Sequence, residues 1–224
     1  MKSWIEDDNI NYEYIIRYIR DTIPRSEGHI REMEEYAKLH EVPISQPESI
    51  RMIEVLLKLS GVRRVLEVGC AIGYSSIRMC RACGGEVVTV ELSDEMADIA
   101  EDNIQKAGLS DKINVIRGDA KDVLPRLAES EKFDMIFVDA AKGQYIHYLP
   151  EVMRLLGTDG VLVSDNVLQE GDIIESRFAV ERRNRTIHSR MREYLYELKH
   201  HDQLQTSIIP LGDGVALSVK RSDI

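Results

Sequence analysis

Apolar residues recur every three or four positions through the first part of the chain, which is the spacing of helices that bury one face. Ile16 and Ile19 mark one such face, and Ile50 and Ile53 mark another. The last of these helices is expected to begin at Pro47, because the first turn of a helix does not need the N–H that proline lacks. The pattern predicts helices, and no strong strand, up to about residue 60.

The spacing changes after residue 60, where short apolar runs alternate with helical segments. Strands are predicted at 64–68, 86–91, 113–117, 133–138, 160–164, 205–210 and 215–220. Helices are predicted from Ser75 to Cys80 and beyond, through 96–104, and over 120–128 and 145–156. This alternation indicates an α/β fold with a mostly parallel, doubly wound sheet. Only four residues, 211–214, join the last two strands, so that pair is expected to be an antiparallel hairpin.

Composition fits one folded unit that does not enter a membrane. The chain has 224 residues, of which 43% are apolar and 30% charged, enough for a sizeable core in a single α/β domain. We divide this domain, residues 1–224, into a helical cap over 1–60 and a ligand-binding core over 61–224. No run approaches the roughly 20 apolar residues of a membrane span.

Two features predict a cytoplasmic protein. The first eight residues carry acids where a signal peptide needs an apolar stretch. The three cysteines, Cys70, Cys80 and Cys83, are too few and odd in number for a disulfide framework. Cys80 and Cys83 have the spacing of a redox or zinc motif, but no second pair or nearby histidine completes a zinc site. We expect them to be structural residues at the end of a helix.

Acidic residues end two of the predicted strands. Asp139 follows the run 133–138, and Asp165 and Asn166 follow the run 160–164. If these strands are neighbours in a parallel sheet, the three side chains meet at its carboxyl edge, where such sheets bind ligands. Their oxygens suit a hard cation such as Mg²⁺. The alternative is that acids stand there only because turns begin there.

A glycine-rich turn joins the first strand to its helix, with Gly69 and Gly73 separated by three residues. The dinucleotide fingerprint G-x-G-x-x-G is therefore absent, and Glu67 would repel a pyrophosphate. The carboxylate of Glu67 is less unfavourable beside a ligand with a positively charged sulfonium than beside a pyrophosphate. Glu91, at the end of the second strand, is placed to accept ribose hydroxyls. Residues 118–120 end the third strand, where they are placed to contact an adenine edge.

These features together resemble class I S-adenosylmethionine (SAM)-dependent methyltransferases over residues 44–220. Residues 67–75 resemble their first motif, and Asp139 to Lys142 with Asp165 and Asn166 resemble the metal-dependent catechol and caffeoyl-CoA O-methyltransferase branch. The resemblance implies a seven-stranded sheet of order 3-2-1-4-5-7-6, SAM and Mg²⁺ as cofactors, and a homodimer. It implies Asp139, Asp165 and Asn166 as metal ligands and Lys142 and Asp139 as catalytic residues. The cofactor-binding residues implied are Ser45, Glu67, Gly69, Gly73, Ser75, Glu91, Asp119, Ala120 and Asp139.

Chelation at such a metal favours two vicinal oxygens, which a catechol and 5-hydroxyuridine both offer. Residues 42–44, 71–75, 139–145, 165–168 and 208–214 resemble the bacterial tRNA 5-hydroxyuridine methyltransferases, which make 5-methoxyuridine at the wobble position. The resemblance implies a tRNA anticodon stem-loop as partner. A small catechol-like phenol is the alternative acceptor, and an exposed loop lysine is the alternative for Lys142.

Charge distribution bears on that choice. The chain carries a formal charge of −10, which disfavours nonspecific nucleic-acid binding. Between residues 177 and 192, however, six arginines and one glutamate give a local charge of +5. We take Arg182, Arg183 and Arg185 as candidate RNA contacts; the alternative is a solvated helix face.

The sequence disfavours two other classes of protein. A binding module that keeps the ligand pocket without catalysis is disfavoured, because all three proposed metal ligands and Lys142 occur together. A nicotinamide dehydrogenase is disfavoured by the missing central glycine of the dinucleotide motif.

Overall fold

The structure is a computed structural model that describes residues 10–128, 130 and 132–222. The acidic stretch used for the targeting prediction lies outside these residues. The centre of the fold is a seven-stranded sheet of order β3-β2-β1-β4-β5-β7-β6, as the resemblance implied. Strand β7 runs antiparallel to both neighbours, and the other pairs are parallel. The strands are β1 Arg64–Val68, β2 Glu86–Glu91, β3 Ile113–Arg117, β4 Phe133–Val138, β5 Leu156–Ser164, β6 Leu204–Ile209 and β7 Val215–Lys220.

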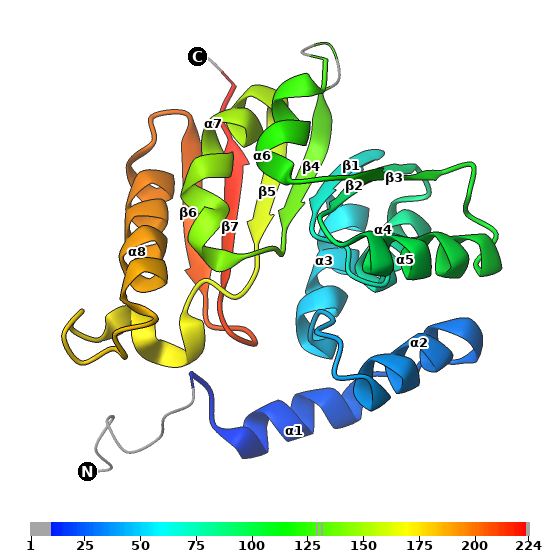
Figure 1. Cartoon of the computed structure of the whole chain (residues 1–224), viewed down its shortest axis with the longest axis horizontal. Helices are drawn as coiled ribbons and strands as arrows, with labels where there is room; N and C mark the ends of the chain where they lie inside the picture. The colour runs from blue at the N-terminus through cyan, green and yellow to red at the C-terminus, as the bar shows by residue number, and fades with distance from the viewer. Residues whose placement is uncertain (1–9, 129, 131, 223–224) are drawn as a thin grey trace.

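Helices cover both faces of the sheet (Figure 1). They are α1 Glu13–Thr22, α2 Gly28–Leu39, α3 Pro47–Leu59, α4 Tyr74–Cys83, α5 Asp94–Lys106, α6 Ala120–Val123, α7 Tyr145–Leu155 and α8 Arg185–His200, with 3₁₀ turns η1 Leu124–Arg126, η2 Lys142–Gln144 and η3 Gln169–Ile174. One apolar cluster lies between the sheet and α6, α7 and α8, and a second lies between the sheet and α2, α3, α4 and α5. The elements therefore form three layers, with apolar residues on both faces of the sheet.

Most predicted elements are present, and the differences have local causes. The helix predicted over 120–128 is only one α-helical turn, because Pro125 has no N–H to continue the ladder. Strand β5 begins at Leu156 rather than at residue 160. Helix α8 was not predicted, although its buried Met191, Leu195 and Leu198 follow helical spacing, because arginines occupy much of its first half.

The two clustered cysteines have the structural environment that was predicted. Cys80 and Cys83 lie in the last turn of α4, and both are buried free thiols. Burial raises the pKa of the Cys80 thiol to about 11, which keeps it protonated and unreactive.

The first helix is attached to the molecule mainly by polar contacts. Helix α1 has no buried residue, and Arg20 ties it to Glu48 at the start of α3 through a 2.8 Å ion pair. By contrast, α3 buries Ile50, Ile53 and Leu57 in the core.

Two expectations stay predictions: the division of the chain into a cap and a core, and the homodimer. Among the described residues, no helix is both long and apolar enough to span a membrane.

Candidate active site

Strand register brings three functional segments to one level. Val68 pairs with Val138 in the β1–β4 ladder, and Val138 pairs with Ser164 in the β4–β5 ladder. The next residues continue the pattern, since Asp139 N–H donates to the Val68 carbonyl and Asp165 N–H donates to the Val138 carbonyl, both at 3.0 Å. The glycine turn and the two acids therefore leave the sheet side by side, as the sequence predicted for its carboxyl edge.

Gly69 is required by the close approach of β1 to β4. Its φ is +92°, and a Cβ at this position would lie 2.2 Å from the Asp139 carbonyl oxygen. No larger residue fits without moving the backbone that carries Asp139. The turn is further held by Glu91, whose Oε2 accepts hydrogen bonds from the N–H groups of Cys70 and Ala71 at 3.2 and 2.9 Å.

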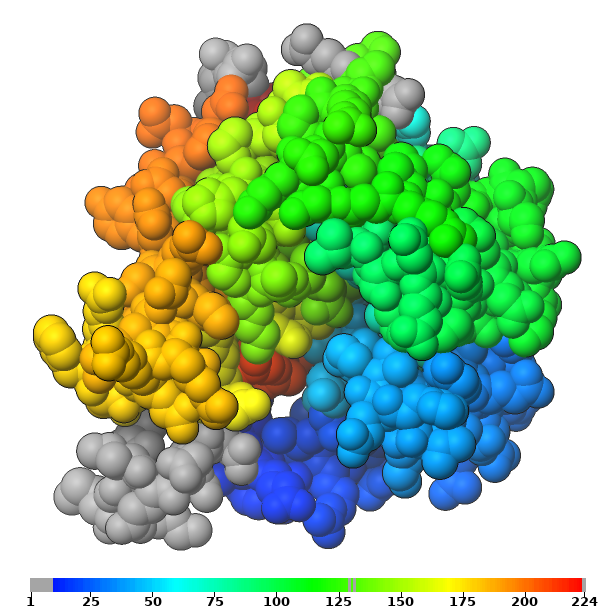
Figure 2. All heavy atoms as spheres, in the orientation of Figure 1, coloured from blue at the N-terminus to red at the C-terminus, as the bar shows by residue number. Residues whose placement is uncertain are grey.

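A cavity of about 510 Å³ opens at this edge, within the usual size range of small-ligand sites. Figure 2 shows this face hollowed between the light-green α7 region and the blue N-terminal helices, with the red β6–β7 hairpin visible inside. Seven of the predicted cofactor residues line it: Ser45, Gly69, Ser75, Glu91, Asp119, Ala120 and Asp139. Lys142 and Asn166 also line it, and so does Tyr148 of α7, which sequence reasoning missed.

Two predicted cofactor residues, Glu67 and Gly73, are not among the lining residues. Glu67 is fully buried and accepts hydrogen bonds from the hydroxyls of Ser75, at 2.5 Å, and Ser76. Burial raises its pKa. Gly73 begins α4 and lies against Ala100 of α5. In this structure both residues shape the glycine turn from behind.

The predicted metal ligands lie together and include an unpaired carboxylate oxygen. Asp165 is 1% exposed; its Oδ1 accepts the N–H of Asn166 at 2.8 Å, while its Oδ2 has no hydrogen-bond partner in the described part of the chain. Asp139 Oδ2 accepts only a long 3.4 Å contact from the Ser45 hydroxyl. Burial raises the pKa of both acids, and the charge of Asp139 raises that of Asp165 further.

This arrangement fits a divalent cation by its chemistry, because a cation would satisfy the unpaired oxygen and offset the repulsion. The candidate ligand set is two carboxylates and one amide. Among the described residues, no three or more histidine, cysteine, aspartate or glutamate side chains are grouped so that they could hold a metal ion.

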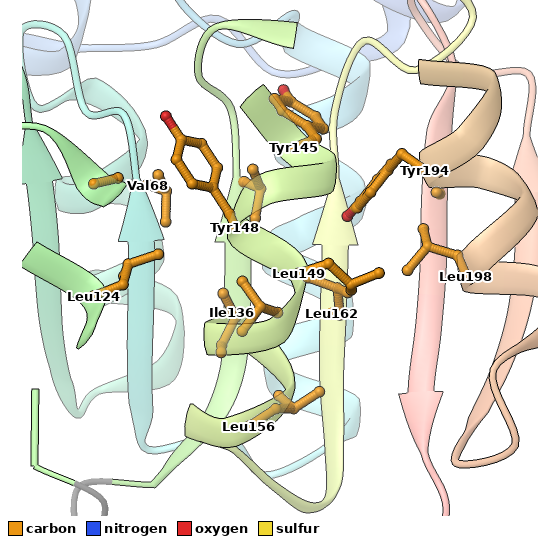
Figure 3. Packing of buried hydrophobic residues seen from close by; sticks show 14 of the residues in the cluster. Val68, Leu124, Ile136, Tyr145, Tyr148, Leu149, Leu156, Leu162, Tyr194 and Leu198 are labelled. Atoms are coloured by element: carbon orange, nitrogen blue, oxygen red, sulfur yellow. The ribbon is translucent and has the colours of Figure 1, made fainter. Parts of the chain in front are cut away.

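Tyr145, at the start of α7, braces the two strand ends that carry these acids. Its hydroxyl donates to the Asp165 carbonyl at 3.1 Å and accepts the Ala140 N–H at 3.3 Å. Its ring lies edge-on to Tyr194 of α8, with the ring centroids 5.5 Å apart. Figure 3 shows Tyr145 above the end of β5 and Tyr194 beside it. The sequence offered no signal for this role, because it depends on the pairing of β4 with β5.

Lys142 lies at the mouth of the cavity in an ion pair that the sequence did not predict. Its Nζ is 2.8 Å from Asp213 Oδ2, on the turn between β6 and β7. The other Asp213 oxygen accepts the N–H of Glu170, and the Asp213 carbonyl accepts the N–H of Leu168 at 2.9 Å. Asp213 thus connects Lys142 to the segment that follows the metal-ligand candidates.

The predicted RNA contacts lie outside the cavity. Arg182 and Arg183 are exposed in the turn before α8, and Arg183 pairs with Glu181 at 2.7 Å. Arg185 begins α8 and donates to the carbonyls of Val180 and Phe178, both at 3.1 Å. None of these three arginines lines the cavity.

Another arginine of the same cluster reaches the 3₁₀ turn η2, which begins with Lys142. Arg190 donates to the Gly143 carbonyl at 3.2 Å, directly beside Lys142. The cluster is therefore fixed next to the cavity mouth, with the acids Glu170, Asp172 and Glu175 at its start.

Comparisons with known proteins point to one family. The O-methyltransferase family profile matches residues 27–221. A catechol O-methyltransferase of Niastella koreensis is 35% identical over 58% of this chain, and the match covers 60% of that protein. A caffeoyl-CoA O-methyltransferase of Eucalyptus gunnii is 28% identical over 96% of this chain and 89% of its own length. The crystal structure of an O-methyltransferase of Bacillus cereus in complex with SAH superposes with a TM-score of 0.82 at 27% identity, covering 93% of this chain and 97% of that one.

Proposed function

The chain belongs to the O-methyltransferase family, and on that premise we propose that it methylates the 5-hydroxyl of 5-hydroxyuridine at the wobble position of tRNA, with a divalent cation such as Mg²⁺. The protein is a SAM-dependent O-methyltransferase of the catechol and caffeoyl-CoA type. We propose the acceptor and the metal in addition.

Methyl transfer from a sulfonium to an oxygen is an in-line displacement, so positioning accounts for much of the rate. Glu91, Asp119 and Asp139 line the cavity and would fix the methyl donor against the glycine turn. Asp139, Asp165 and Asn166 would hold the cation, which when bound lowers the pKa of an acceptor hydroxyl and orients it.

Lys142 is the candidate residue for taking the acceptor's proton or for stabilising the resulting oxyanion. It lines the cavity, and its ammonium is paired with Asp213 in this structure. An ammonium has no lone pair, so Lys142 can act as a base only after its ammonium has lost a proton. As a cation it can stabilise an oxyanion directly.

The observation that supports RNA as acceptor is the basic segment held at the cavity mouth. Residues 177–192 carry a charge of +5 in a chain of net charge −10, and Arg190 is hydrogen-bonded beside Lys142. Cationic side chains bind the phosphates of an RNA backbone, whereas a small neutral phenol has no phosphate for them to bind. A catechol-like phenol is the second candidate, favoured by the similarity to the Niastella catechol O-methyltransferase.

Nucleoside mass spectrometry of tRNA from cells lacking the protein tests the proposal. We expect 5-hydroxyuridine to accumulate and 5-methoxyuridine to disappear. The purified protein should restore the methyl group on that tRNA with SAM and Mg²⁺, and chelation should stop it. Unchanged 5-methoxyuridine together with rapid turnover of catechol would establish the phenol alternative instead.

A further inference from the structure

Two apolar side chains stand out on the segment between the metal-ligand candidates and α8. Ile174 and Phe178 are 81% and 83% exposed, the highest values among the large apolar side chains of the described residues. A phenylalanine in this position contributes nothing to the core. Exposed apolar surface beside a site is a common mark of a binding surface.

The backbone that carries Phe178 is fixed by its neighbours. Val180, two residues later, is buried, and the Ser176 hydroxyl accepts the Phe178 N–H at 3.3 Å. Arg185 donates to the Phe178 carbonyl at 3.1 Å, and its guanidinium carbon lies 5.9 Å from the centre of the Phe178 ring. The ring is therefore presented to solvent from an anchored turn.

Both ends of this segment are attached close to Lys142. At the start, the Glu170 N–H bonds to Asp213, which in turn pairs with Lys142. At the end, Arg190 bonds to the Gly143 carbonyl. Figure 2 shows the yellow and light-orange segment bordering the hollowed face of the molecule. Phe178 therefore belongs to a segment whose two ends are attached beside Lys142, and it lies outside the cavity itself.

Phe178 lies in a basic stretch of the chain, and one guanidinium group of that stretch lies against its ring. Six arginines and Glu181 lie between 177 and 192, Glu181 pairs with Arg183, and the acids Asp172 and Glu175 precede the stretch. Arg185 is the arginine beside the ring, and its hydrogen bonds go to backbone carbonyls, which do not neutralise its charge. A flat aromatic face beside a guanidinium group matches an unpaired nucleotide, which offers a base to stack and a phosphate to pair.

We propose that Phe178 is the stacking platform for an unpaired base of the RNA substrate, with the arginines around it contacting the neighbouring phosphates. This inference rests on the proposed function, since it names how the same site would hold an RNA loop. RNA recognition is thereby assigned to an apolar side chain that lies outside the cavity and within the basic stretch 177–192.

Binding and turnover of an anticodon stem-loop carrying 5-hydroxyuridine test the platform, with the free nucleoside as second substrate. Phe178→Ala should weaken binding of the stem-loop and raise its KM by roughly 5- to 150-fold, the range for loss of one base stack. Phe178→Tyr should bind the stem-loop and turn it over with an affinity and a KM close to those of the parent protein. Turnover of the free nucleoside should not change, because Phe178 lies outside the cavity. Leu59→Ala is the matched control, since Leu59 is 78% exposed at the end of α3.

Other outcomes overturn one proposal or the other. Equal binding of the stem-loop by Phe178→Ala and the parent protein would overturn the platform, and a lower oligomeric state in that variant would assign the ring to contacts between copies. Equal losses on stem-loop and nucleoside would also overturn it. If the stem-loop binds in a way that depends on Phe178 but is not methylated, the proposed reaction is overturned and the role of Phe178 in RNA binding is supported.

Discussion

Two polar clusters of the molecule differ in how their acids are compensated: a partly buried one between α2, α3 and α4, and a buried one at the carboxyl edge of the sheet. In the first, Arg78 donates to Glu54 at 2.6 Å and to the Tyr74 hydroxyl at 2.7 Å, and that hydroxyl donates to Glu34 at 2.8 Å. Every acid of this cluster has a cation or a phenol beside it.

At the carboxyl edge of the sheet, by contrast, the acids raise one another's pKa. The charge of Glu67 adds to the burial that raises the pKa of Asp139, and Asp139 acts likewise on Asp165. The lysine nearest to them, Lys142, is paired with a further acid, Asp213. A buried acid without its own cation costs stability, and such acids are typical of sites that bind a ligand. The first cluster stabilises the fold, and the second fits the divalent cation that we propose.

Breaking the compensated cluster should give the largest loss of stability. Arg78→Met removes the partner of Glu54 Oε1 and the donor to the Tyr74 hydroxyl, and it leaves Glu54 with Arg51 as its remaining cation; the Arg78 and Glu54 side chains are only 10% and 15% exposed. We expect the free energy of unfolding in urea to fall by about 1.5–3 kcal/mol, the cost of losing hydrogen bonds to a charged group. Arg31→Met, in an exposed pair with Glu35, is the control and should cost under about 1 kcal/mol. Similar losses in the two variants would remove the distinction between the clusters.

Substitutions of Lys142 should distinguish its two candidate roles, a general base and a cation that stabilises the oxyanion. Lys142→Met removes both, and we expect kcat to fall roughly 100-fold or more. Lys142→Arg keeps the cation but provides no base at ordinary pH. Activity within about tenfold of the parent in Lys142→Arg would assign a stabilising cation, whereas loss equal to that of Lys142→Met would assign a base. SAM binding by calorimetry should be unchanged in both variants, which checks that the cavity is intact.

The smallest effect concerns the stability of the acidic site itself. Because the pKa of Asp165 is raised in the folded state, the folded protein binds more protons than the unfolded chain above about pH 4, and stability is lost as pH rises from there towards neutral. Asp165→Asn removes that loss. Without divalent cations, the variant should therefore gain about 1 kcal/mol over the parent at pH 7.5 and much less at pH 4.

Chemical denaturation at both pH values measures this difference, with Asp111→Asn as an exposed control. Adding Mg²⁺ should stabilise the parent protein but not Asp165→Asn. A variant less stable than the parent at pH 7.5 would mean that Asp165 is already compensated within the fold, like the acids between α3 and α4.

Local sequence determined much of this protein. Alternating apolar runs predicted every strand of the sheet to within a few residues, because burial on both faces leaves a short-range pattern. Acids and glycines at strand ends predicted which edge carries the site, and the register placed Gly69, Asp139 and Asp165 together there. The order of the strands came from the resemblance rather than from the pattern.

Tertiary structure decided the partners. Lys142 and Asp213 are 71 residues apart, and Tyr145 and Asp165 are 20 apart, so no local pattern joins them. Glu67 has the sequence position of a ligand contact, yet its serine partners on α4 enclose it behind the cavity. Hydrophobic periodicity is a property of neighbouring residues, whereas compensation of a buried charge depends on which distant segments the folded sheet brings into contact.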